Sequence, residues 1–268
     1  MRKKFFKRYE SVKEFESALS STKKQAGFAS ESSHCCDFGF NGTHNYKEAN
    51  DKLLYGDKEL AKQINDAGLY TTKCNIQKYT ERRAFAAAVV GAVPHVPNFI
   101  AGVPNTMIRQ IKTHVKTPVV TIGYNMSVGG ATSKMTIIRN ASELLSAVLI
   151  LESKGIRVNL YALSHSETQK DEALLAIKIK SSGQPLDLLK VAYPIAHPSM
   201  NRRHKFCWLE HFGPLSFGGG YGWCIDDEKK SKGAFAEHGL RFDSIFTCGS
   251  LDGMTAEEIV EQISKGAK

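Results

Sequence analysis

Residues 117–163 contain the pattern that most constrains the fold of this chain. An extended apolar run over 117–124 ends in a polar loop that contains Asn125, Ser127, Gly129 and Gly130. Beyond the loop, apolar residues recur at spacings of three and four, which predicts an amphipathic helix with one buried face. Gly155 stands where a helix commonly ends, and residues 157–163 alternate as a strand does. The stretch therefore predicts one βαβ unit, whose parallel strands usually have helices on both faces of the sheet.

The C-terminal half continues the same alternation. Residues 173–180 predict a strand beside 157–163, and residues 242–248 predict a last strand. Thr255 and Glu258 form a capping box for a terminal helix. We expect an α/β, Rossmann-like domain of three layers with a mainly parallel sheet over residues 117–268.

Residues 1–116 differ from the rest, since they are richer in short helices and polar turns. Ser11 with Glu14 predicts one helix start, and Asn45 predicts another. Residues 93–104 alternate prolines with hydrophobic residues, and prolines exclude a central strand or a helix interior there. We expect a smaller, mostly helical N-terminal region that ends in a buried, rigid, proline-rich connector.

Composition limits the class of protein. The chain has 268 residues, 42% of them hydrophobic, which is enough to bury a large core. It contains no apolar run of the roughly 18–20 residues that cross a bilayer, so we expect no membrane partner and a cytoplasmic location. Six cysteines without Cys-x-x-Cys spacing fit reduced thiols in such a compartment.

Charge leaves the type of partner open. The net charge is +9, and basic residues cluster between Arg2 and Arg8 and again at Arg202, Arg203, His204 and Lys205. Such clusters could bind nucleic acid through its phosphates. Each could equally be an ordinary solvated face of the protein.

The predicted α/β segment resembles a divergent von Willebrand factor A-like domain. More closely, most of the chain resembles uncharacterised phage and prophage proteins that join such a domain to an N-terminal segment. Three stretches support this resemblance: Asn41-Gly-Thr-His-Asn-Tyr-Lys-Glu-Ala with Gly56, Val96-Pro-Asn-Phe-Ile-Ala-Gly-Val-Pro, and Leu151-Glu-Ser-Lys-Gly-Ile-Arg-Val. The resemblance implies a location in the host cytoplasm or in the virion, and the family has no assigned activity to carry over to this chain.

The same resemblance places a metal-site motif, Asp-x-Ser-x-Ser, at the end of the first strand. Asn125 stands at the position of the leading Asp, Ser127 matches the first Ser, and Gly129 replaces the second. Mg²⁺ prefers charged oxygen ligands, so these changes should weaken its binding severely. Alternatively, Asn125 and Ser127 hydrogen-bond within the loop, while Gly129 and Gly130 allow a positive-φ turn.

Anion binding by backbone N–H groups is another possible use of this loop, because a helix follows it. The phosphate-loop spacing Gly-x4-Gly-Lys-Ser/Thr is absent, however, so nucleotide binding is weakly supported.

Three functions therefore stay open. The leading hypothesis is a non-enzymatic, phage-related protein that binds another protein as an adaptor or structural component. The second is a protein of replication, transcription or packaging that binds nucleic acid through its basic clusters. The third is an enzyme with an unusual centre near Asn125, Ser127 and Asp252, although no nucleophile elbow is present.

Overall fold

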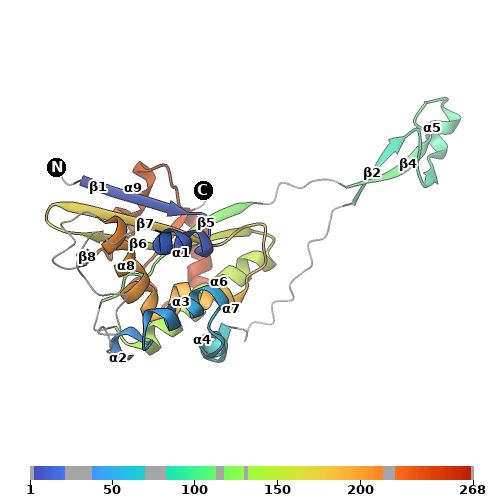
Figure 1. Ribbon diagram of the computed structural model, residues 1–268. Coiled ribbons are helices and arrows are strands. Elements are labelled where there is room, and N and C mark those ends of the chain that lie inside the picture. Colours follow the sequence, from blue (N-terminus) through green and yellow to red (C-terminus); the bar gives the residue numbers. More distant parts are fainter. Residues whose placement is uncertain are drawn as a thin grey trace. The chain divides into compact units, whose positions relative to one another are not determined.

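The computed structural model describes residues 3–21, 38–69, 83–112, 118–129, 132–213 and 221–266 (Figure 1). The chain forms two compact units, of which the larger contains residues 1–74 and 119–268 and the smaller contains residues 75–118. This division differs from the predicted boundary between residues 116 and 117. The reason is that strand β1 (Lys3–Tyr9) pairs in parallel with β7 (Asp171–Lys180), which places the start of the chain in the main sheet.

The larger unit is built on a mostly parallel sheet of six strands in the order β1-β7-β6-β5-β9, with β8 paired to β6. The pairs β1–β7, β5–β6 and β5–β9 are parallel, and β6–β7 and β6–β8 are antiparallel. The remaining strands are β5 (Val119–Asn125), β6 (Arg157–Glu167), β8 (Trp223–Cys224) and β9 (Ser244–Phe246). The predicted α/β class with a mainly parallel sheet is confirmed.

The predicted βαβ unit is present as β5, helix α6 (Lys134–Ser153) and β6. The Ser133 side chain caps α6 by accepting a hydrogen bond from Thr136 N. The helix ends as predicted, because Gly155 has a φ of 81° and Ile156 N donates to Leu151 O. The apolar stripe of α6 packs on the sheet, and 12 of the 20 residues of this helix are buried.

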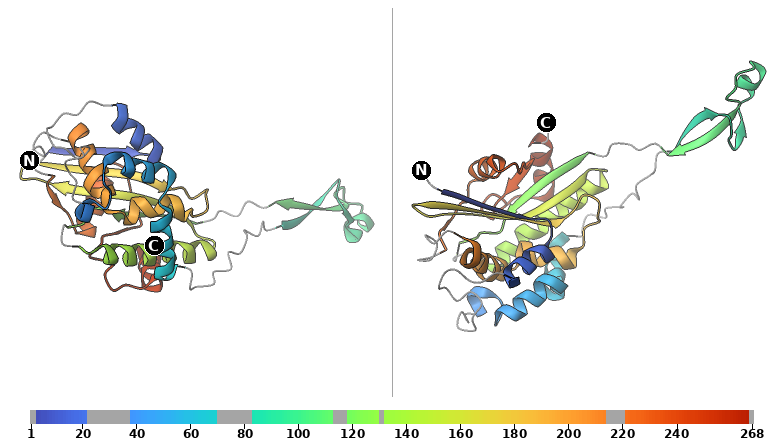
Figure 2. Two further views of the ribbon diagram at one scale, coloured as in Figure 1. Left: turned by 60° about the horizontal axis from the view of Figure 1, so that its bottom comes forward. Right: turned by 45° about the horizontal axis from the view of Figure 1, so that its top comes forward.

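Helices cover both faces of this sheet, which makes three layers (Figures 1 and 2). Helix α9 (Glu228–Glu237) packs on one face around Phe235. Besides α6 and α9, the larger unit contains the helices α1 (Val12–Ser21), α2 (Phe38–Asn41), α3 (Tyr46–Tyr55), α4 (Lys58–Ile64), η1 (Asn65–Leu69), α7 (Leu188–Ala196), η2 (Met200–Lys205), α8 (Phe206–Phe212) and α10 (Ala256–Gly266). Helix α6, together with α1, α3, α4, α7, η2, α8 and α10, contributes side chains to the main core cluster. None of the described helices is long and apolar enough to cross a membrane.

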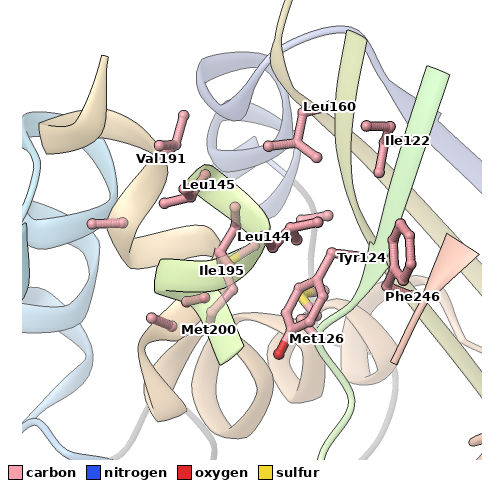
Figure 3. Packing of buried hydrophobic residues seen from close by; sticks show 14 of the residues in the cluster. Ile122, Tyr124, Met126, Leu144, Leu145, Leu160, Val191, Ile195, Met200 and Phe246 are labelled. Atoms are coloured by element: carbon pink, nitrogen blue, oxygen red, sulfur yellow. The ribbon is translucent and has the colours of Figure 1, made fainter. Parts of the chain in front are cut away.

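The main core lies between the sheet and α6. Ile122 and Tyr124 of β5 point toward Leu144 of α6, and Ile195 of α7 closes the same cluster (Figure 3). Each of these side chains is almost completely buried. Burial of a leucine or isoleucine side chain is worth about 1.5–3 kcal/mol, so this interface contributes several kcal/mol to the stability of the larger unit.

The predicted helix starts in the N-terminal region are confirmed. Glu14 N donates to Ser11 Oγ at 3.1 Å, and Glu48 N donates to Asn45 Oδ1 at 2.8 Å. Strand β1 was not predicted, because its basic residues interrupt the alternation of apolar and polar residues that is typical of a strand. Its apolar side chains Phe5, Phe6 and Tyr9 nevertheless pack against the core.

The smaller unit corrects the prediction of a buried connector. It is an antiparallel sheet in the order β2-β4-β3, made of β2 (Arg83–Ala88), β3 (Val93–Pro94) and β4 (Met107–Lys112), with helix α5 (Val96–Ile100) between β3 and β4. Pro94 lies on an edge strand, where its missing N–H does not interrupt the sheet. Among residues 85–110, whose side chains are described, none is buried.

Candidate functional site

The topology of the sheet creates one preferred position for a ligand. The chain leaves β5 through α6 to reach β6 on one side, while β9 lies on the other side of β5. Ligands of open α/β sheets bind at the carboxyl ends of strands where the strand order reverses in this way. A cavity of about 670 Å³ lies there, lined by residues that follow β5, including Ser127 and Gly129, and by residues that follow β9, including Cys248 and Asp252.

The predicted loop after β5 therefore borders a cavity, although Asn125 and Ser127 are already engaged within the protein. Asn125 Nδ2 donates to Ile225 O at 2.8 Å, and Asn125 Oδ1 accepts from Ser127 N at 3.1 Å. Ser127 Oγ lies 2.9 Å from Ser164 Oγ. Gly130 lies outside the described residues. These contacts match the alternative in which the loop side chains hold their own backbone.

The same contacts do not fit a Mg²⁺ site at these two residues. Mg²⁺ requires several oxygen ligands in near-octahedral geometry, at least one of them usually a carboxylate. Here the Asn125 amide oxygen is already hydrogen-bonded, and the cavity beside the loop is also lined by the cationic side chains of Arg202 and Lys205.

The basic run Arg202–Lys205 is not the exposed patch that a nucleic-acid partner requires. All four side chains are buried, because η2 packs between α3, α7 and α8. The run splits into two pairs with different surroundings. Arg202 and Lys205 line the cavity with Gly129, so three predicted binding residues do come together.

The other two residues of the run hold the fold together away from the cavity. Arg203 Nε donates to Thr43 Oγ1 at 2.8 Å, and an Arg203 terminal nitrogen donates to Thr43 O at 2.9 Å. His204 Nδ1 lies 3.1 Å from the Tyr193 hydroxyl. Burial lowers the pKa of His204 to about 3, so its imidazole is neutral at ordinary pH.

Lys205 is the unusual group of the cavity. Its side chain is only 1% exposed, and Nζ has no hydrogen-bond partner among the described residues. The nearest described compensation is the ring of Phe206, whose centroid lies 5.2 Å from Nζ. Burial lowers the pKa of the Lys205 ammonium below its ordinary value. A buried amine without a hydrogen-bond partner lowers the stability of the fold. Such costly groups occur often at functional sites, so Lys205 is a candidate for a ligand-binding residue.

The rim of the cavity is aromatic and acidic. The rings of Phe206 and Tyr221 stack with centroids 3.6 Å apart, and Trp223 lies beside them with 62% of its surface exposed. Asp226 and Asp252 are exposed residues of the rim. Asp252 forms an ion pair of 2.5 Å with Arg139, which partly offsets its charge.

One buried cluster has the geometry of a catalytic relay. Ser231 Oγ lies 2.9 Å from His165 Nδ1, and His165 Nε2 lies 2.6 Å from Glu172 Oε1. Sequence reasoning missed this cluster because its members come from α9, β6 and β7. The Ser231 and His165 side chains are fully buried, so a substrate cannot reach the hydroxyl. The cluster links three elements, and burial lowers the pKa of His165.

The smaller unit carries the second candidate site, a group of individually exposed apolar side chains. Its members lie on β2, on β3, on α5 and on the turns between them. They are Phe85, Val89, Val90, Val93, Val96, Phe99, Ile100 and Val103. We call this set the apolar surface of the smaller unit. Large exposed apolar patches mark interaction sites in proteins.

The fold and the cavity together define an α/β protein with a ligand-sized cavity at the point where the strand order of its sheet reverses. Residues 2–266 match the family described as "Domain of unknown function (DUF7192)", and the chain belongs to that family. No curated protein and no solved structure matches the chain.

Proposed function

We propose that this is a binding protein, and that the smaller unit docks onto a partner protein through its apolar surface. The observation that carries the proposal is that residues 85–110 include no buried side chain. A three-stranded sheet needs an apolar face buried against something in order to be stable. The unit therefore gains stability when another molecule covers its apolar surface.

The positive charge of the smaller unit indicates which charge its partner carries. Residues 83–112 contain Arg83, Arg109 and Lys112 and no Asp or Glu. A second copy of this unit would bring like charges together, which disfavours self-association. A partner surface that is apolar and rimmed by acidic residues would complement both the apolar side chains and the positive charge of the smaller unit. That this partner belongs to a phage or its host is part of the same proposal, and the resemblance noted in the sequence supports it.

Nucleic acid is a weaker candidate partner. Within the part of the predicted clusters that the structure describes, the burial of Arg202–Lys205 leaves Lys3, Lys4, Lys7 and Arg8 of β1 as the exposed basic residues. Lys4 pairs with Glu237 at 2.5 Å, and Arg8 pairs with Glu10 at 2.5 Å. These acidic neighbours reduce the attraction of β1 for phosphates.

The test is capture of binding proteins from the producing cells on the full-length chain and on variants. Phe99→Asp with Ile100→Asp changes two α5 side chains that are 72% and 80% exposed. We expect this double variant to lose the captured protein, and the captured protein to slow amide hydrogen exchange of residues 83–112 in the wild type. The melting temperature of the larger unit should not change, since neither residue belongs to its core.

Tyr55→Asp is the control, because it places one aspartate, half the added charge of the double variant, at a 74% exposed aromatic residue of the larger unit. It should keep the captured protein. Capture of the same proteins by the wild type and the Phe99→Asp, Ile100→Asp variant would refute docking through the smaller unit. Salt-sensitive binding of DNA or RNA by both chains would favour the nucleic-acid alternative.

A further inference from the structure

Two of the residues that line the cavity at the carboxyl ends of β5 and β9 carry unpaired polar groups. Lys205 Nζ and Asn201 Oδ1 are both buried and have no hydrogen-bond partner among the described residues. Both belong to η2 and both line the cavity. π-Helical turns are rare and occur frequently at functional sites. What distinguishes these two groups from the other unpaired buried groups is that their residues line this cavity, where a ligand can supply an acceptor for Lys205 Nζ and a donor for Asn201 Oδ1.

The start of helix α6 supplies a second favourable feature for a negative charge. Thr132 and Thr136, on either side of its capping residue Ser133, line the cavity. The helix has 20 residues and no acidic residue in its first turn. Its N-terminus therefore presents the positive end of the helix dipole to the cavity that Lys205 and Arg202 also line.

We propose that this cavity binds a small organic phosphate, with the phosphate group near Lys205 and the start of α6. A phosphate group has several acceptor oxygens, which match the Lys205 ammonium and the hydroxyl of Thr132 at the cavity. Ser127 Oγ lies 2.9 Å from Ser164 Oγ and Thr136 Oγ1 lies 2.8 Å from Ser133 Oγ, and each of these two hydroxyls can donate to the phosphate only while it accepts from its serine partner. The volume of about 670 Å³ lies within the range of about 300–1,000 Å³ that is typical of small-molecule sites. A metal cation in the same position would be repelled by the two basic side chains.

The rim residues suit the organic part of such a ligand. Trp223 is exposed at the cavity and can stack on a planar ring. Asp226 and Asp252 are exposed, so solvent screens their repulsion of the phosphate group. Their carboxylates can accept hydrogen bonds from ligand hydroxyl or amino groups.

Isothermal titration of the full chain with AMP, ribose 5-phosphate and inorganic phosphate tests the proposal. Adenosine and ribose are the matched compounds without phosphate. We expect at least one of the three phosphates to bind in the millimolar range or tighter, and neither adenosine nor ribose to bind comparably. Lys205→Met, which keeps the volume and removes the ammonium, should weaken binding about tenfold or more.

Two further variants keep the proposal testable if Lys205→Met fails to fold. Thr136→Val should weaken binding by removing a hydroxyl at the start of α6, and Asp252→Asn should strengthen it slightly by removing a rim charge. Lys190→Met, at a side chain that is 71% exposed and outside the cavity, should leave binding unchanged. Failure of all three phosphates to bind at millimolar concentration, or equal affinity in the wild type, Lys205→Met and Thr136→Val, would overturn the proposal.

Discussion

Two buried histidines should make the larger unit sensitive to acid. Burial lowers the pKa of His197 to about 3 and that of His204 to about 3, against 6.5 for an unperturbed imidazole. The folded state therefore excludes protons that the unfolded chain binds. A lowered pKa in the folded state contributes stability above pH 6.5, and that stability is lost as the pH falls from 6.5 toward 3.

The magnitude follows from linkage. At about pH 5 the unfolded imidazole is almost fully protonated and the folded one is not, which costs about 2 kcal/mol for each histidine. The two histidines together should lower the free energy of unfolding by about 4 kcal/mol at about pH 5. This is a large part of the roughly 5–15 kcal/mol that is the typical free energy of unfolding of a folded domain. His197 Nε2 lies 3.9 Å from Asp57 Oδ2, and this carboxylate offsets only part of the cost.

The assay is denaturant unfolding at about pH 7.5 and about pH 5 for the wild type, His197→Gln and His204→Gln. Between about pH 7.5 and about pH 5 the free energy of unfolding should fall by about 2 kcal/mol less in each variant than in the wild type, because glutamine does not titrate. His44→Gln changes an exposed imidazole and should leave the loss unchanged. An equal loss in the wild type and in both buried-site variants would refute the assignment of acid sensitivity to these residues.

Two other substitutions test the sheet and the loop. Gly123→Ala would place a Cβ 2.4 Å from Leu163 Cδ1 and should reduce the free energy of unfolding by about 1–3 kcal/mol, whereas Gly183→Ala, where a Cβ meets no atom within 4 Å, should have little effect. Chemical denaturation measures both, and equal stability of the two variants would contradict the packing of β5. Asn125→Asp replaces the amide that donates to Ile225 O at 2.8 Å and should cost about 2 kcal/mol at neutral pH. If Mg²⁺ restored the melting temperature of this variant, the loop would have the geometry of a metal site and would lack only the carboxylate.

The elements with strong local signals could be predicted from the sequence. The stripe on α6, the caps at Ser11 and Asn45 and the end of α6 at Gly155 each depend on residues within a few positions of one another. Strand β1 was missed because its partner β7 lies more than 160 residues further along the chain. The smaller unit was misread as a connector, since proline spacing alone cannot show that its hydrophobic residues are exposed.

The sequence by itself determined the βαβ unit of residues 117–163 and the position of its loop at the end of a strand. Only the tertiary structure decided how the side chains of that region are used. Asn125 binds Ile225, and Arg203 binds Thr43, in each case at least 100 residues away along the chain. The basic run at 202–205 looks uniform in sequence, yet packing turns Lys205 toward the cavity and Arg203 toward Thr43. Periodicity and capping are local properties of a chain, whereas burial and charge compensation depend on contacts that exist only after folding.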